Sequence, residues 1–305
     1  MAHQPRLAVE SIAGQRPYQE DSVLAETLPD GRTLIAVADG MGGHAAGEVA
    51  SALALETLKE TVGERHPLGD AFRLANERVH KKAAEPGKLG MGTTLVAVLV
   101  DGAEFSVANV GDSRAYLVSA QGIRRLTEDH SFVVEAMKRG QSEAEAMATP
   151  WKDALTRSIG TEAEVKADVS GPHPVQDDSA ILVCSDGLYK TLSDNEIREL
   201  FVRSGGAQGA AQSLVSAALD AGSDDNISVA IVEYGEVPRE TAPTTMVLSY
   251  DPDDARAAAE READELAAVA AVVDEGAVVG GLPMAAVAAI IVVVGVLVAI
   301  LVFGG

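Results

Sequence analysis

Short apolar runs alternate with polar segments along the first 235 residues. Runs of this length that are rich in branched residues and end at Gly or Asp predict strands. They cover 33–38, 93–100, 104–110, 114–118, 179–184 and 227–233. Asp101-Gly102 separates the second run from the third, and this dipeptide is a strong signal for a tight hairpin. We therefore expect antiparallel sheets.

Two pairs of longer segments have the spacing of amphipathic helices, with apolar residues three and four positions apart. The predicted helices are 47–62, 68–83, 193–203 and 208–220. The third opens at a capping box, in which Ser193 is followed three residues later by Glu196. Helix pairs inserted twice between hairpins predict an α+β fold, a four-layer αββα sandwich in which two antiparallel sheets pack together and a helix pair covers each.

Composition divides the chain into three regions. Residues 1–235 are expected to form one domain, in which the irregular segment 131–160 is interpreted as a surface flap beside a site. Residues 236–281 hold 11 acidic and 3 basic residues and are rich in alanine, so we interpret them as a linker. Residues 282–303 are uncharged and form the third region.

The uncharged region 282–303 has 22 residues, and a helix needs about 20 apolar residues to cross a bilayer. A buried core helix is the alternative, but soluble helices of this length have a polar face. We therefore predict a single C-terminal transmembrane helix. The N-terminus lacks the apolar core of a signal peptide, so the domain before the helix is expected in the cytoplasm, at the cell membrane.

Charge and cysteine content narrow the range of functions. Lys and Arg number 24 against 46 acidic residues, a net charge of -22, which disfavours binding of nucleic acid. The single cysteine, Cys184, excludes an intrachain disulfide and a thiolate-bound metal cluster. The acidic residues are therefore the first candidates for chemistry.

Four acidic residues stand at the ends of predicted strands or in the turns beside them, Asp39, Asp112, Asp186 and Asp225. Two more, Glu20 and Asp21, stand together near the start of the domain. The pattern of an apolar run followed by Asp-Gly occurs twice, at Asp39 and at Asp186. Carboxylates that meet at one rim of a sheet repel each other unless cations neutralise them. A single Asp-Gly pair is usually only a turn, but the joint pattern favours a metal site.

Oxygen ligands of this kind select hard cations such as Mg²⁺ or Mn²⁺. Zinc is disfavoured because no Cys and His residues have ligand spacing. A glycine after Asp39 lets the backbone approach closely, so that the carbonyl of Gly40 can itself be a ligand. Two such ions with a shared carboxylate and a bridging hydroxide have the layout used in phosphoryl hydrolysis.

Eight motifs occur in one order along the chain: RPYQEDS, VADGMGGH, GMGTTLVAV, VGDSRAYL, LTEDHS, LTRSIG, VCSDGL and SDDNISVAIV. In this order they resemble the metal-dependent protein phosphatases, the protein phosphatase 2C family, and its bacterial serine/threonine phosphatase branch most of all. The resemblance covers about residues 6–235. It implies a β-sandwich flanked by helix pairs that hydrolyses phosphoserine and phosphothreonine in proteins.

The resemblance also implies a set of metal ligands. The family's ligands fall on Asp39, which bridges two ions, on the carbonyl of Gly40, and on Asp186 and Asp225. Glu20 matches a ligand that acts through water. The implied cofactor is a pair of Mn²⁺ or Mg²⁺ ions.

Three further roles follow from the same resemblance. Asp21 matches an acid that holds metal-bound water. Arg16, four residues before Glu20, matches the phosphate-binding arginine, which holds two phosphate oxygens as a fork. In the bacterial branch a third ion is bound through the aspartate that matches Asp112, with Asp186 shared.

His44 is our candidate for the general acid that protonates the leaving alkoxide. In many eukaryotic members a histidine follows the Asp-Gly pair directly, whereas Met41 stands there in this chain. The bacterial branch is similar to this chain in placing the histidine three residues later. A helix-entry residue without a chemical role is the alternative for His44.

We therefore expect a protein serine/threonine phosphatase in which a hydroxide bridging two Mn²⁺ or Mg²⁺ ions attacks phosphorus in line. Its partners would be phosphoproteins and the serine/threonine kinases whose signalling it reverses at the membrane, and the domain would be monomeric. Two other classes stay open, an inactive relative that acts as a membrane-tethered binding module, and a metal-dependent nuclease. The complete set of acids disfavours the first, and the acidic charge disfavours the second.

Overall fold

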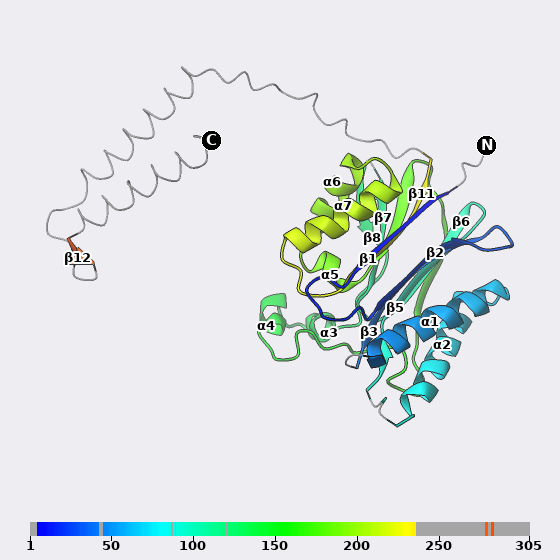
Figure 1. The fold of residues 1–305 in the computed structure, drawn as a ribbon, viewed down its shortest axis with the longest axis horizontal. Helices are drawn as coiled ribbons and strands as arrows, with labels where there is room; N and C mark the ends of the chain where they lie inside the picture. The colour runs from blue at the N-terminus through cyan, green and yellow to red at the C-terminus, as the bar shows by residue number, and fades with distance from the viewer. Residues whose placement is uncertain are drawn as a thin grey trace, which may run out of the picture. The chain divides into compact units, whose positions relative to one another are not determined.

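The computed structural model describes residues 5–42, 45–86, 88, 90–119, 121–235, 278–279 and 282–283. The chain separates into two compact units, Met1–Thr241 and Ala242–Gly305. In the second unit the described residues form two short antiparallel strands, β12 (Val278–Val279) and β13 (Leu282–Pro283). All other described elements belong to the first unit (Figure 1).

Two antiparallel sheets form the centre of the first unit. The five-stranded sheet runs in the order β1 (Arg6–Ile12), β11 (Ile227–Tyr234), β10 (Ser179–Cys184), β7 (Arg114–Ser119) and β8 (Gly122–Arg125). The six-stranded sheet runs in the order β2 (Asp21–Thr27), β3 (Thr33–Met41), β5 (Leu95–Asp101), β6 (Glu104–Val110) and β9 (Asp168–Pro174), with β4 (Gly92–Thr93) paired to the end of β3.

Helices cover the outer face of each sheet (Figure 1). The six-stranded sheet packs against α1 (Ala45–Gly63) and α2 (Leu68–Ala83), and the five-stranded sheet packs against α6 (Asp194–Arg203) and α7 (Ala207–Asp220). Three shorter helices lie in connections, α3 (Phe132–Lys138), α4 (Glu143–Met147) and α5 (Asp186–Tyr189). The first unit therefore has the predicted α+β architecture, with the layers in the order helix, sheet, sheet, helix.

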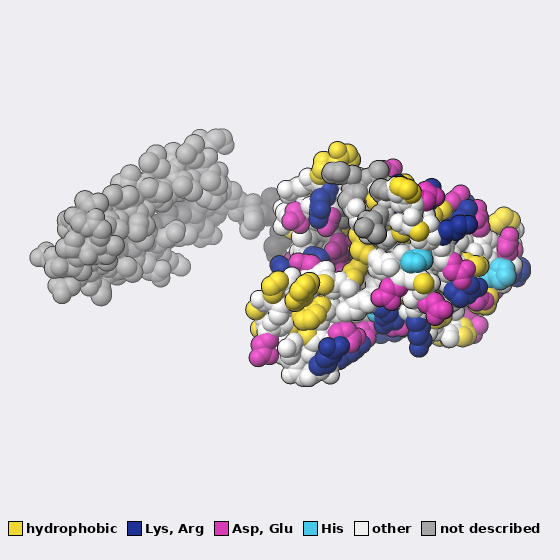
Figure 2. Space-filling model, turned by 90° about the horizontal axis from the view of Figure 1, so that it is seen from below, with side chains coloured by type: hydrophobic (Ala, Val, Ile, Leu, Met, Phe, Trp, Pro, Cys, Tyr) yellow, Lys and Arg dark blue, Asp and Glu magenta, His cyan; other side chains and the backbone are white. Residues whose placement is uncertain are grey.

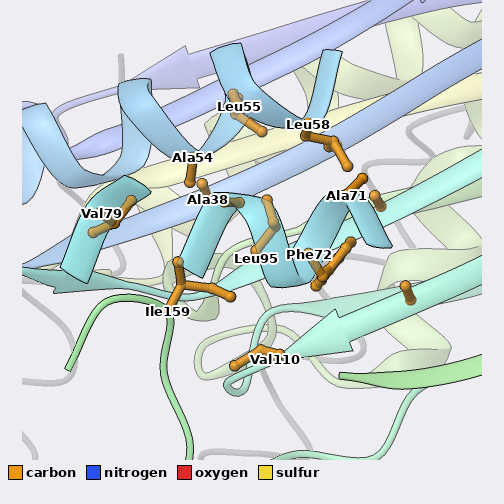
Figure 3. Packing of buried hydrophobic residues seen from close by; sticks show 14 of the residues in the cluster. Ala38, Ala54, Leu55, Leu58, Ala71, Phe72, Val79, Leu95, Val110 and Ile159 are labelled. Atoms are coloured by element: carbon orange, nitrogen blue, oxygen red, sulfur yellow. The ribbon is translucent and has the colours of Figure 1, made fainter. Parts of the chain in front are cut away.

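Three apolar clusters hold these layers together. Between the sheets, Val37 of β3 lies in one fully buried cluster with Val183 of β10. The next residue of β3, Ala38, faces the helices instead, because successive side chains of a strand alternate between its faces. Figure 3 shows this helix-side cluster, in which Leu58 of α1 and Phe72 of α2 are buried. Burial on both faces explains why the central strands are continuous apolar runs.

The elements predicted from the sequence occur with small changes. All six predicted strands are present, and the four helices begin and end within two residues of the prediction. One prediction is wrong in detail, because 93–100 is not a single strand. Thr94 leaves the ladder, since its backbone N–H donates to the carbonyl of Asp39 at 2.8 Å, and the run divides into β4 and β5.

The predicted membrane span lies almost entirely outside the described residues. Among the residues that the structure describes, no helix is long and apolar enough to cross a bilayer. Of the span 282–303, only Leu282–Pro283 are described, and they belong to β13 instead of a helix. Of the predicted linker 236–281, only Val278–Val279 are described. Both assignments stay predictions.

Candidate metal centre

The predicted acidic residues come from the ends of strands in both sheets. Asp39 lies near the end of β3, and the residue opposite it on β2 is Asp21. Asp186 begins α5 just after β10, and Asp225 lies two residues before β11. Because β10 and β11 are neighbours in the five-stranded sheet, carboxylates from two packed sheets meet at one rim.

A cavity of about 720 Å³ opens at this rim. Among the residues that line it are seven of the nine predicted site residues, Arg16, Glu20, Asp39, Gly40, Asp112, Asp186 and Asp225. Asp21 is buried nearby, where its charge acts on Asp39. His44 lies outside the described residues. The fold thus brings together side chains that are as far apart in sequence as Arg16 and Asp225.

Two threonines fix the backbone of Asp39. Its carbonyl accepts hydrogen bonds from the hydroxyl of Thr93 and from the N–H of Thr94, each at 2.8 Å. Its own N–H donates to the hydroxyl of Thr94 at 2.9 Å. With both backbone groups of Asp39 engaged, the position from which its carboxylate enters the cavity is set by Thr93 of β4 and by Thr94, which follows it.

The glycines after Asp39 and Asp186 are required by packing. A Cβ on Gly40 would lie 2.2 Å from the carbonyl oxygen of Gly47, at the start of α1. A Cβ on Gly187 would lie 2.2 Å from the carbonyl oxygen of Asn226. Glycine at these positions permits a close approach of the chain's own backbone, and the role of the Gly40 carbonyl as a metal ligand stays a prediction.

Three acids of this cluster, Asp21, Asp39 and Asp112, have raised pKa values. Loss of hydration raises the pKa of Asp39 well above its usual range, and the charges of Asp21 and Asp186 raise it further. Burial likewise raises the pKa of Asp21 to about 7, although hydrogen bonds from serines oppose the shift. Burial and the charge of Asp186 raise the pKa of Asp112 to about 6. Cations bound among these groups would favour their ionised forms.

Two basic side chains of the protein already contact this cluster. Lys190 Nζ donates to Asp186 Oδ2 at 2.6 Å. Arg16 Nη2 donates to Asp225 Oδ2 at 2.8 Å, and its Nε donates to the carbonyl of Asp224 at 3.1 Å. In the part of the chain that the structure describes, no three His, Cys, Asp or Glu side chains converge closely enough to hold an ion as they stand.

The donor set nevertheless fits a hard divalent cation. All its members are oxygen donors, which such ions prefer. Asp186 Oδ1 and Asp21 Oδ1 are buried without a hydrogen-bond partner among the described residues, and buried polar atoms are normally paired. An ion bound by Asp225 would compete with Arg16 for this carboxylate.

Asn226 is a residue of this site that sequence reasoning missed. Its Oδ1 accepts the N–H of Glu20 at 2.8 Å, and its Nδ2 donates to the carbonyls of Ala13 and Tyr18 at 3.0 and 2.9 Å. It thereby ties the loop that carries Arg16 and Glu20 to the start of β11. The motif SDDNISVAIV contained it, but only its acids were considered.

Arg157 is a second missed residue, in the motif LTRSIG. It lines the cavity, and its Nη1 donates to Asp168 Oδ1 at 2.7 Å. Asp168 Oδ2 also lies 3.2 Å from Nε2 of the buried His130, whose Nδ1 accepts the N–H of Gly111 at 3.1 Å. His130 thus links Gly111 to Asp168 within this network.

Relatives of known name are similar to the chain over most of its length. The serine/threonine phosphatase stp of Listeria monocytogenes is 36% identical over 230 residues, which are 72% of this chain and 91% of that protein. Protein phosphatase PhpP of Streptococcus pneumoniae is 36% identical over 235 residues, 74% of this chain and 95% of that protein.

Solved structures show the same fold. The serine/threonine phosphatase of S. agalactiae matches 75% of this chain and 99% of its own, with a TM-score of 0.70 and 32% identity. The catalytic domain of the phosphatase PstP, solved with two manganese ions, matches 76% of this chain and 98% of its own, with a TM-score of 0.65 and 32% identity. Residues 11–227 match protein phosphatase 2C, and the chain belongs to the protein phosphatase 2C family.

Proposed function

We propose that this chain hydrolyses phosphoserine and phosphothreonine esters in proteins with the help of two Mn²⁺ or Mg²⁺ ions. The observation that carries the proposal is the convergence of Asp39, Asp186 and Asp225 with Arg16 on one cavity at the rim of the two sheets. The relatives named as serine/threonine phosphatases, and the two manganese ions in PstP, support it.

Each acid has a place in this proposal. Asp39 would contact both ions, with Asp186 and Asp225 on either side, the carbonyl of Gly40 as a further ligand, and Glu20 acting through water. When bound, such a pair of ions activates water and neutralises charge on the phosphoryl group. Asp21, buried near Asp39 with the hydroxyl of Ser185 donating to its Oδ2 at 2.8 Å, would orient water at the site.

Arg16 would bind the phosphate. Its side chain is half-exposed at the cavity and pairs with Asp225. Asp225 would be one of the residues that hold an ion, and the guanidinium of Arg16 would then bind two phosphoryl oxygens as a planar fork that lysine cannot imitate.

His44 remains our candidate for the general acid. It immediately precedes α1, whose third residue, Gly47, packs against Gly40. A proton donor is needed because an alkoxide leaves as a strong base.

One experiment separates the candidate functions. Full-length protein is stripped with a chelator, then assayed on a phosphothreonine peptide and on DNA, with and without Mn²⁺. We expect phosphate release from the peptide only with Mn²⁺, and no cleavage of DNA. Figure 2 shows acidic and basic side chains interspersed over one described face, which is unlike a continuous basic track for nucleic acid. A protein that binds the peptide without releasing phosphate would instead be a binding module.

We also propose that residues 282–303 anchor the chain in the cell membrane with the phosphatase domain in the cytoplasm, where it would reverse the action of serine/threonine kinases on phosphoproteins. The support is the length and apolar character of this segment. The domain would act as a monomer.

A further inference from the structure

Lys190 lies one turn after Asp186, at the C-terminal end of α5. Its ammonium is 2.6 Å from Asp186 Oδ2 and 3.7 Å from Asp153 Oδ1, which belongs to the segment between α4 and β9. Its charge also acts on Asp112. Lys190 thus faces three acids, two of which are predicted metal ligands.

The ammonium of Lys190 stands between two cavities. Lys190, Asp112 and Asp153 line the metal cavity and also a second cavity of about 890 Å³. The second cavity is lined by residues of α3 and α4, among them Met137 and Met147. A cation at this boundary would contact Asp112 and Asp186 together, which is the place expected for a third ion.

Helix α5 holds the lysine at this boundary. The backbone N–H of Lys190 donates to the carbonyl of Asp186 at 3.0 Å, and residues four apart lie on one face of a helix. The guanidinium carbon of Arg114 lies 3.4 Å from the ring centroid of Tyr189, which fixes the same helix from the other side. The approach of Lys190 to Asp186 follows from the sequence spacing and is reinforced by packing.

A divalent ion and an ammonium group cannot share this position, because their like charges would lie within contact distance. We propose that the Lys190 ammonium takes the place of the third divalent ion in this chain, so that it binds two ions at Asp39, Asp186 and Asp225 and none at Asp112. Lys190 is then a positioning residue that neutralises Asp112 and Asp186 and connects them to Asp153. The inference rests on the proposed two-ion centre.

The test counts bound metal. Chelator-stripped full-length protein is titrated with Mn²⁺, and bound ions are measured by calorimetry and by electron paramagnetic resonance of free Mn²⁺. We expect two ions in the wild type and in Lys190→Arg, which keeps the charge. Lys190→Gln should bind three ions, and any residual third-site binding to the wild type should be at least about tenfold weaker than in this variant. Adding Asp112→Asn to Lys190→Gln should remove that ion.

Lys152→Gln is the matched control. Lys152 Nζ lies 3.8 Å from Asp153 Oδ2, and none of its ion pairs is with Asp186, so its loss should leave the count at two. Circular dichroism and thermal unfolding check that each variant is folded. Three tight ions in the wild type, or an unchanged count in folded Lys190→Gln, would overturn the inference and leave the two-ion centre standing. A wild type that binds no Mn²⁺ would overturn both.

Discussion

Asp39 illustrates how the candidate metal centre depends on single residues. The threonines of β4 and the following turn engage both backbone groups of Asp39, and two bound ions would share its carboxylate. Asp186 and Asp225 approach from the other sheet, so neither occupies the position of Asp39.

We therefore expect Asp39→Asn to lower turnover of a phosphothreonine peptide by at least about tenfold at saturating Mn²⁺, since one ligand to both ions is weakened. Asp101→Asn, at the exposed last residue of β5, is the control and should behave as the wild type. More than a tenth of wild-type turnover in folded Asp39→Asn would contradict the bridging role.

Asn226 offers a second prediction at this scale. Asn226→Ala removes three hydrogen bonds and leaves the N–H of Glu20 and the carbonyls of Ala13 and Tyr18 without these partners. A lost buried hydrogen bond costs about 1–3 kcal/mol, so the melting temperature should fall by several degrees, and Mn²⁺ affinity should fall as well because the loop with Glu20 loosens.

Asn195→Ala, at an exposed position of α6, is the control for Asn226→Ala in thermal unfolding and in Mn²⁺ titration. Asn226→Asp keeps an oxygen that can accept the N–H of Glu20, but it loses the amide N–H donors. This variant therefore tests the accepting and the donating side of the amide separately. If Asn226→Ala melts like the wild type, the amide does not tie the loop to β11.

At the scale of elements, strand β9 pairs with β6 and is also joined to an ion network at its first residue. Asp168, its first residue, accepts from Arg157 and lies beside His130. The hydrogen bond from Arg157 is the main cause that lowers the pKa of Asp168 to about 2. Burial lowers the pKa of His130, although Asp168 opposes this.

These shifts predict a direction for stability against pH. An acid with a depressed pKa stabilises the fold above its unfolded pKa of about 4, and this contribution is lost as the pH falls toward 2. We expect Asp168→Asn to be less stable than the wild type in urea at pH 6, and the difference to shrink at pH 2.5. Asp101→Asn should show no such convergence. A difference that stays constant with pH would show that packing, not charge, is lost.

The extent to which a strand is buried decides whether the sequence could predict it. The runs that became β3, β5, β10 and β11 are apolar because both of their faces are covered, so their identity was plain. β1, β2, β8 and β9 were not predicted because few of their residues are fully buried, and in β8 and β9 none is. For such strands the decisive information is the partner, which lies elsewhere in the chain.

The site residues also divide into those that the sequence could predict and those that it could not. The acids could be predicted because they follow apolar strands in recognisable motifs. Asn226 and Lys190 could not, because their importance depends on contacts with Glu20 and with Asp153 and Asp112 that only the folded chain creates. The sequence also could not show why position 40 requires glycine, because the atom that a Cβ there would clash with belongs to Gly47, on the other side of a turn.

At the scale of the whole molecule, the described site residues all lie in the first compact unit, and the predicted anchor lies in the second. Truncation after Glu236 should therefore give a soluble domain with full activity on a phosphothreonine peptide. The full-length chain should sediment with membranes and resist alkaline carbonate extraction. Full-length protein in the soluble fraction would contradict the span, and a folded but inactive truncation would show that the tail does more than anchor.

The pairing of β1 with β11 has a consequence for folding during synthesis of the chain. The first strand of the domain cannot pair until the last strand has been synthesised, because Arg6 lies opposite Glu233. Asp225 is also the last of the predicted metal ligands to be synthesised. A ribosome that has made the first 200 residues therefore carries a chain with neither a closed five-stranded sheet nor a full ligand set. Domains dominated by such distant pairings fold slowly, so a nascent chain stays without activity until its whole catalytic domain has emerged.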